Sequence, residues 1–82
     1  MFHRIATVQP LPDYVLYAQF EDGKKRKYDV KPLFSKWPVF NDLRDGGLFD
    51  RVAVDDGGYG VVWNDRIDLS AEDIYEFGEA VQ

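Results

Sequence analysis

The stretch YVLYAQFEDGKKRKYDV, residues 14–30, decides the fold. Over residues 14–20 the side chains alternate, so that one side of an extended chain carries Tyr14, Leu16, Ala18 and Phe20. This period of two is typical of a half-buried β-strand. Asp22-Gly23 is typical of a hairpin turn because these residues tolerate positive φ angles. We therefore predict a hairpin whose second strand runs over residues 25–30.

The residues before the hairpin predict another strand. Residues 4–9, RIATVQ, combine β-branched and polar residues. Pro10 and Pro12 follow, and proline cannot donate a hydrogen bond to a neighbouring strand. The first strand is therefore predicted to end before Pro10.

The residues after the hairpin predict irregular chain with short helical turns. Pro32 suits the first turn of a helix at 31–34, and the Trp37-Pro38 step stops it. A second helical turn is expected at 39–43 and should end at the glycines of 45–47. The residues expected to cover one face of the sheet are Leu33, Phe34, Trp37, Phe40, Leu43 and Phe49.

The C-terminal half predicts three more strands and a helix. Strands are expected at 50–54 and 59–63, joined by the turn DDGG at 55–58, and at 66–69. Ser70 is a candidate N-cap for a helix over 71–79, with Glu72 and Asp73 in its first turn. The residues expected to face the sheet are Ala71, Ile74, Phe77 and Ala80.

Together these elements predict one domain over residues 1–82. The fold class is α+β, with a small, mostly antiparallel sheet of about five or six strands. Short helical segments join the strands, and a C-terminal helix packs on one face of the sheet. A chain of this length buries roughly 60% of the surface that its unfolded form exposes, so we expect modest stability.

Charge is distributed unevenly along the chain. The formal net charge is −5. Residues 21–36 hold six basic and three acidic side chains, whereas residues 37–82 hold eleven acidic and three basic ones. This polarity disfavours nucleic acid overall and attracts it only near the hairpin. It suits a basic protein partner.

The composition excludes several kinds of site. There is no cysteine, which excludes disulfides, thiolate metal sites and cysteine nucleophiles. His3 is the single histidine and is expected at a frayed end, so one chain has no histidine cluster for a transition metal. We expect no cofactor and no enzymatic activity.

A metal site or acid–base catalysis is an alternative interpretation of four aspartates in the C-terminal half of the chain, of which Asp68 is one. Asp55-Asp56 precede Gly57-Gly58, which is ordinary turn chemistry. The spacing of a calcium-binding loop is absent. We therefore interpret these side chains, and Asp68 beside the helix start, as structural. The four residues are Asp55, Asp56, Asp65 and Asp68.

The sequence also indicates where the protein resides. The first residues lack the long apolar run of a signal peptide. No apolar stretch approaches the roughly 20 residues that a membrane-spanning helix needs. We expect a cytoplasmic protein that does not bind membranes.

Several exposed or basic side chains are candidates for binding a partner. The basic run at 24–27 would meet phosphate or an acidic partner, or would only protect the hairpin from edge pairing. Trp37 is either core or an exposed anchor, since tryptophan is frequent at interface hot spots. Trp63, on an inner strand, is expected in the core. The candidate partner-binding residues are Lys25, Lys27, Trp37, Tyr59 and Tyr75.

An ordered set of residues resembles a known family. The set comprises Phe20-x-Asp22-Gly23, Tyr28-Asp29-Val30, Phe40-x-x-Leu43, Phe49, Trp63 and Asp68-Leu69-x-x-x-x-Ile74-Tyr75. It resembles the bacterial family of small α+β proteins called domain of unknown function 2442. The resemblance implies no accepted activity and no catalytic residues. Some members are encoded beside another short protein, in an arrangement like a toxin–antitoxin pair.

These observations favour a non-enzymatic protein-interaction domain, the antitoxin-like member of a toxin–antitoxin-like pair being one form of it. The partner is expected to be another protein, encoded nearby as the resemblance implies, and self-association is a further option because the aromatic content is 16%. The alternative is a small-ligand or nucleic-acid binding module that uses the basic hairpin.

Overall fold

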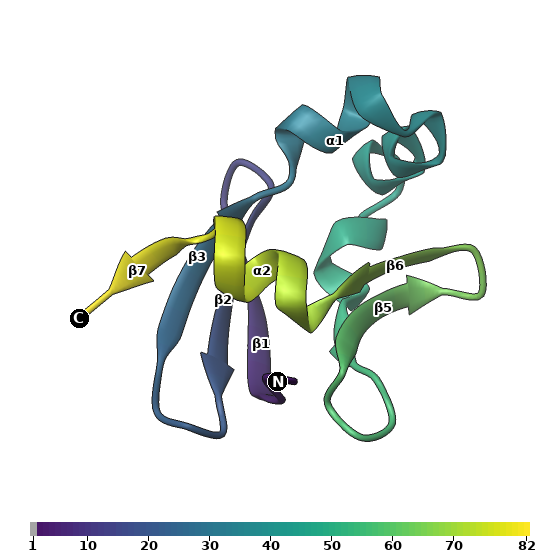
Figure 1. The fold of residues 1–82 in the computed structure, drawn as a ribbon. Coiled ribbons are helices and arrows are strands. Elements are labelled where there is room, and N and C mark those ends of the chain that lie inside the picture. The colour runs from purple at the N-terminus through teal and green to yellow at the C-terminus, as the bar shows by residue number, and fades with distance from the viewer. Residues whose placement is uncertain (1) are drawn as a thin grey trace.

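The computed structural model describes residues 2–82, and its elements form two antiparallel sheets with helical segments around them (Figure 1). Helix α2 lies across the first sheet, and α1 with the 3-10 helices covers one end of the molecule. In chain order the elements are β1 (Ile5–Leu11), β2 (Val15–Phe20), β3 (Lys25–Asp29), α1 (Lys31–Lys36), η1 (Pro38–Arg44), η2 (Leu48–Arg51), β4 (Ala53–Val54), β5 (Gly60–Asn64), β6 (Ile67–Ser70), α2 (Ala71–Phe77) and β7 (Glu79–Val81).

The predicted hairpin is the centre of the first sheet, whose strand order is β1-β2-β3-β7. Strands β2 and β3 pair antiparallel, with Leu16 opposite Tyr28 and Ala18 opposite Arg26. Gly23 has φ +90° in the turn, where glycine meets no steric cost. The α+β class and the mostly antiparallel pairing are confirmed, with the strands divided between two sheets.

Strand β1 continues through Pro10, so the prediction that it ends before this proline is wrong. Pro10 lies opposite Leu16 on β2. The Phe20 amide donates to the Lys24 carbonyl on the β3 side. Because backbone amides alternate between the two edges of a strand, the amide of Leu16 also points toward β3. The nitrogen of Pro10 therefore points away from β2, toward the free edge of the sheet. A proline in that position removes no ladder hydrogen bond.

The second sheet has the order β4-β5-β6. The strand predicted over residues 50–54 is wrong at its start, because Leu48–Arg51 form a 3-10 helix and β4 is Ala53–Val54. Gly47, at φ +75°, turns the chain into this helix. Phe49 then stacks on the buried Trp63, and the Trp63 Nε1–H donates to the Phe49 carbonyl at 3.1 Å. The tertiary contact with Trp63 thus outweighs the local strand propensity of the chain that follows Phe49.

Helix α2 ends at Phe77, earlier than predicted. Its N-cap is Ser70 as predicted, with the Ser70 Oγ accepting from the Asp73 amide at 3.1 Å. After Gly78 the chain extends as β7 and pairs with β3, a strand that the sequence did not indicate. The backbone N–H and C=O groups at this edge of β3 pair with β7, and they would lack these partners if α2 continued for another turn.

The core joins both sheets and α2. Trp63 is buried as predicted, whereas the predictions that Phe77 and Ala80 face the sheet are wrong, since both are exposed. Trp37 is 54% exposed, so the expectation that it covers one face of the sheet is wrong, and its role as an anchor for a partner stays a prediction. No helix within residues 2–82 is long and apolar enough to cross a membrane. The buried residues are Ile5, Leu16, Ala18, Phe20, Val30, Leu33, Phe40, Leu43, Phe49, Val61, Trp63, Ile67, Leu69, Ala71 and Ile74.

Candidate functional site

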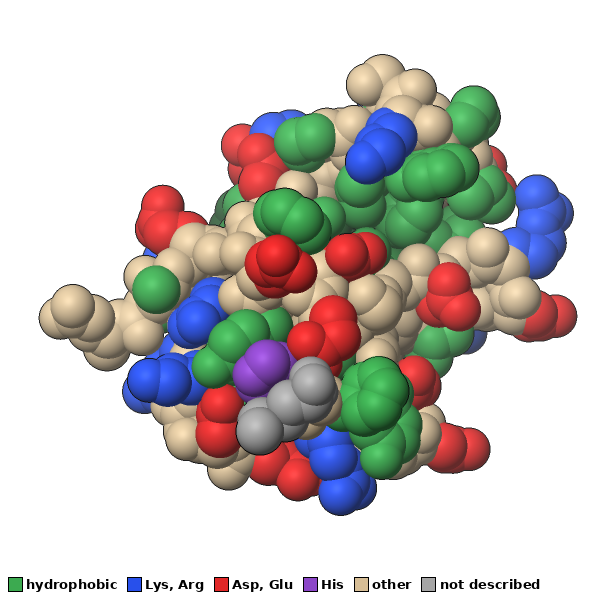
Figure 2. Space-filling model, in the orientation of Figure 1, with side chains coloured by type: hydrophobic (Ala, Val, Ile, Leu, Met, Phe, Trp, Pro, Cys, Tyr) green, Lys and Arg blue, Asp and Glu red, His purple; other side chains and the backbone are tan. Residues whose placement is uncertain are grey.

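A groove of about 720 Å³ opens between α1 and η1 on one side and β6 and α2 on the other. We call it the α1–α2 groove. Figure 2 shows hydrophobic side chains gathered under the helices at this end of the molecule, with acidic side chains along the lower border. A volume of this size is typical of ligand-binding clefts.

The floor of the groove is apolar and belongs to the core. Leu33 of α1, Phe40 of η1 and Leu69 of β6 line it, and each is less than 10% exposed. Leu33 is the buried residue of α1, a short helix whose first turn contains Pro32. Leu69 points inward because residues alternate along β6, which leaves Asp68 and Ser70 outside.

Two large side chains at the mouth of the groove are exposed to solvent. Trp37 joins α1 to η1 in an extended conformation, which the following proline favours. Phe77 is the last residue of α2 and is 71% exposed. Both line the groove, although they are far apart in the sequence. An aromatic side chain that remains exposed beside an apolar floor is typical of a binding surface.

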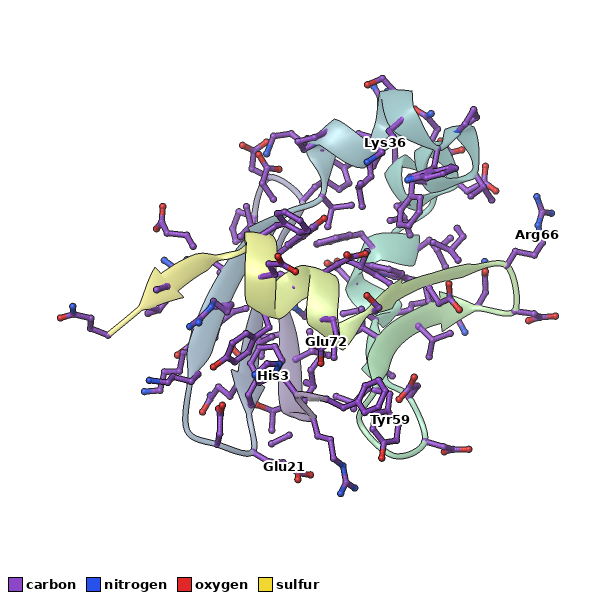
Figure 3. All side chains as sticks on the ribbon, in the orientation of Figure 1. His3, Glu21, Lys36, Tyr59, Arg66 and Glu72 are labelled. Atoms are coloured by element: carbon purple, nitrogen blue, oxygen red, sulfur yellow. The ribbon has the colours of Figure 1, made fainter. Side chains whose placement is uncertain are left out.

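Charged side chains line the groove together with these apolar groups. Asp29, Asp68 and Asp73 contribute carboxylates, and Lys36 is the one basic lining residue. The Lys36 Nζ lies 5.9 Å from the centroid of the Trp37 ring, within the range of a cation–π contact. Lys36 is the last residue of α1, as Figure 3 shows.

The surroundings shift the pKa values of two groups in the groove, Asp29 and Tyr28. Burial raises the pKa of Asp29, but hydrogen bonds from the Lys31 side chain and amide lower it overall, below its ordinary value. The Lys31 Nζ lies 2.9 Å from Asp29 Oδ1 and 3.1 Å from Asp13 Oδ2. Burial, followed by the negative charges of Asp73 and Asp29, raises the pKa of the Tyr28 hydroxyl. Tyr28 is therefore a neutral hydrogen-bond donor in the groove at physiological pH.

The candidate partner-binding residues lie in separate places. Trp37 is at the groove. Lys25 and Lys27 lie on the face of β3 turned away from α2, because Arg26 between them packs on α2. Tyr59 lies in the turn before β5, 53% exposed and 6.1 Å from the Phe2 ring. Their roles in binding stay predictions, and no single surface contains all five.

Tyr75, the fifth candidate, is enclosed by other side chains of the molecule. The His3 ring stacks on it at 3.5 Å between centroids, and the Arg26 guanidinium lies 4.4 Å from its centroid. Its hydroxyl donates to Asp22 Oδ2 at 3.3 Å. The tyrosine therefore links the hairpin, α2 and the residues before β1.

His3 is held firmly, so the expectation of a frayed end is wrong. Its amide donates to Glu72 Oε2, and its Nδ1–H donates to Glu72 Oε1 at 2.9 Å, since a carboxylate can only accept. These bonds lower the pKa of Glu72 below its ordinary value of 4.5, the amide bond having the larger effect. Figure 3 shows His3 and Glu72 close together below α2.

Replacing Glu72 with glutamine is expected to lower Tm at pH 7 by about 2–5 °C. A carboxyl whose pKa is lower in the folded than in the unfolded state stabilises the fold above its unfolded pKa, here about 4.5. That stabilisation is lost as the pH falls through the lower folded value. The difference in Tm between wild type and E72Q should therefore be smaller at pH 3 than at pH 7, as thermal unfolding at both pH values would measure.

The matched control is Glu76→Gln, an exposed position on the same helix, for which we expect no pH-dependent difference. A difference for E72Q that is the same at pH 7 and pH 3 would contradict the role assigned to the His3–Glu72 contact.

Most of the groove is not apparent from the sequence. The sequence does not indicate Tyr28, Asp73 or Phe77 as binding residues, and it indicates Asp68 only as a structural or catalytic carboxylate. The alternation of β3 does place Tyr28 on the same face as Leu16, which is a usable signal. Nothing local indicates that Phe77 faces α1, because its exposure depends on where α2 ends.

Asp55, another aspartate for which catalysis is an alternative, forms a structural hydrogen bond. Asp55 Oδ1 accepts from the Tyr59 amide at 2.9 Å and shapes the turn before β5. Asn64 shapes the next turn, at Asp65, by accepting from the amides of Arg66 and Ile67. Within residues 2–82 no group of three or more acidic or histidine side chains is arranged to hold a metal ion.

Comparison with known proteins gives a family and a fold. A family model described as protein of unknown function, DUF2442, matches residues 5–80 and confirms the resemblance drawn from the residues. No curated protein matches the sequence. A crystal structure from Nitrosomonas europaea, of a protein described as a candidate DNA-binding protein, is similar with TM-score 0.78 and 24% identity. The match covers 92% of this chain and 48% of that one, so this chain spans about half its length.

Proposed function

This chain belongs to the DUF2442 family, whose function is unknown, and we propose that it is a non-enzymatic module that binds a partner protein in the α1–α2 groove. The proposal rests on the groove itself, because the family assigns no activity. In an antitoxin-like arrangement, the partner would be a protein encoded beside this one.

The observation that supports the proposal best is the pair of exposed rings above an apolar floor. Trp37 and Phe77 are 54% and 71% exposed, and both line the same cavity. Burying an aromatic side chain contributes roughly 1.5–3 kcal/mol. Interface hot spots typically combine such a ring with a pocket from which water is excluded. A partner segment seated in the groove would cover both rings at once.

The chemistry of the groove favours binding over catalysis. It contains neither cysteine nor histidine among its lining residues. Its one serine, Ser70, accepts a hydrogen bond from the Asp73 amide as the N-cap of α2. General acid–base catalysis requires a positioned donor and acceptor with matched pKa values. The Tyr28 hydroxyl, whose pKa is raised, is suited to donate a hydrogen bond to a ligand.

Replacing Trp37 with alanine and Phe77 with serine together is expected to abolish partner capture while the fold is kept. Both side chains are exposed, so their removal costs little stability, whereas hot-spot aromatics each contribute about 2 kcal/mol or more to binding. The measurement is affinity capture from cells of the source organism, with the retained proteins identified by mass spectrometry. We expect one protein that wild type retains and W37A/F77S does not.

The matched control is F2A/Y59A, which removes an equally exposed aromatic pair outside the groove. It should retain the same partner. Circular dichroism would verify that both double variants are folded. If W37A/F77S captures the same proteins as wild type, the groove is not the binding site and the proposal fails.

Nucleic-acid binding is the second candidate function, supported by the description of the structurally similar protein. Its proposed surface would include Lys25 and Lys27. Less positive charge is available to phosphate there than the sequence indicates. Lys27 lies opposite the acidic Glu79 on β7, and Arg26 packs on Tyr75. Treating the lysate with nuclease before capture distinguishes the two functions: proteins retained only through nucleic acid would disappear, and a groove-bound partner would not.

A further inference from the structure

The groove lining carries more negative charge than it can neutralise. Asp29 is paired with Lys31, which lies 2.9 Å from its Oδ1. Within residues 2–82, neither Asp68 nor Asp73 forms an ion pair. Lys36 is the one basic residue of the lining, and it lies over Trp37. Two carboxylates beside an apolar floor therefore lack a cation.

The aromatic side chains of the groove are suited to a cation as well as to apolar groups. The faces of tryptophan and tyrosine rings attract ammonium and guanidinium groups. The Lys36 Nζ already lies 5.9 Å from the Trp37 centroid, so this ring accepts a positive charge from the chain's own side chain. Tyr28 lines the same cavity, as does Asp73.

The negative charge of the wider surface also favours a cationic partner. Residues 37–82, which contribute most of the lining, hold eleven acidic and three basic side chains. Figure 2 shows acidic side chains on the face that contains the groove, below the hydrophobic cluster. Such a field attracts a cationic partner and increases its rate of encounter.

We propose that the groove binds a basic amphipathic segment of the partner protein, with arginine or lysine at Asp68 and Asp73 and an apolar side chain between Trp37 and Phe77. This inference rests on the proposed function and specifies the chemistry of the partner. A neutral or acidic segment would leave both carboxylates unpaired beneath it, which costs free energy when water is excluded.

Selection from a random peptide library displayed on phage tests the composition of the partner segment. Wild-type protein would be the target, and W37A/F77S would remove peptides that do not use the groove. We expect the selected peptides to be enriched in arginine or lysine together with leucine or aromatic residues. Enrichment in neutral or acidic peptides would overturn the inference and leave the proposed function standing. Failure to obtain any groove-dependent peptide would count against both.

A selected peptide then tests the two carboxylates by measurement of Kd. We expect D68N/D73N to weaken binding about tenfold or more and to flatten its salt dependence. Lys36→Ala should strengthen binding, because it removes a competing cation. The control Asp65→Asn, at the exposed turn after β5, should change Kd less than about twofold. Equal Kd values for wild type and D68N/D73N would overturn the inference.

Two other occupants would give different results. A second copy of this chain would appear in analytical ultracentrifugation as a dimer that W37A/F77S abolishes, and that result would overturn the inference. A small organic cation would appear as binding of free arginine amide with the same affinity as the whole peptide, which would also overturn it. A monomer that binds the peptide much more tightly than arginine amide supports the proposed segment.

Discussion

Replacing Ile74 with alanine is expected to lower the free energy of unfolding by about 3–4 kcal/mol. Ile74 is fully buried on the inner face of α2, and that helix contacts β3, β5 and β6. Alanine would leave a cavity where α2 meets both sheets, and the surrounding strands cannot all move inward to fill it. Because small proteins are stable by roughly 5–15 kcal/mol, this loss would remove a large part of the total.

Urea denaturation measures this loss, with the fluorescence of the buried Trp63 reporting the core. The control is Glu76→Ala, an exposed position on the same helix, which should change stability by less than about 0.5 kcal/mol. A decrease for I74A below about 1 kcal/mol would show that α2 is not fixed to the core as the structure describes. The groove would then lack a rigid wall, since α2 carries Asp73 and Phe77.

Replacing Gly78 with alanine is the second change with a large expected effect, a loss of about 2–3 kcal/mol. Its backbone is extended, with φ −74°, so alanine meets no conformational penalty there. A Cβ atom would nevertheless collide with the Ile74 carbonyl oxygen and come within 3.1 Å of Arg26 Cβ. Either α2 or β7 must move away from β3, and the hydrogen bonds between β3 and β7 would be lost.

Hydrogen exchange distinguishes this effect from general destabilisation. We expect amides over 79–81 to exchange faster in G78A, together with the lower urea midpoint. The control is Gly46→Ala, where φ is +62° but no atom lies within 4 Å of the added Cβ. That variant should lose only about 1 kcal/mol, from the left-handed backbone. Equal losses at both glycines would show that the space around Gly78 is not the limiting factor.

The elements that were predicted correctly depend on neighbouring residues. The hairpin has a turn chemistry and an alternation that both lie within residues 14–30, and the helix cap at Ser70 bonds three residues ahead. The errors occurred where a distant partner decides the conformation. Phe49 is drawn into a 3-10 helix by Trp63, and β7 exists because β3 offers a free edge. His3 is fixed by Glu72, which lies at the other end of the chain.

The candidate site follows the same division. Trp37 is predictable as a candidate because it lies in irregular chain and tryptophan is frequent at interface hot spots. The partners of Trp37 in the groove come from β3, β6 and α2, and only the packing of these elements brings them together. The basic hairpin was the most prominent charge feature, yet Arg26 is used within the fold, against Tyr75.

The sequence by itself determined the α+β class, the central hairpin, the family, the absence of cysteine chemistry and the acidic C-terminal half. These properties depend on composition or on contacts between residues close along the chain. Tertiary structure alone decided that an apolar floor, two exposed rings and two carboxylates without cations share one groove. Long-range packing sets that arrangement, because the end of α2 and the position of α1 each depend on surfaces contributed by other parts of the chain.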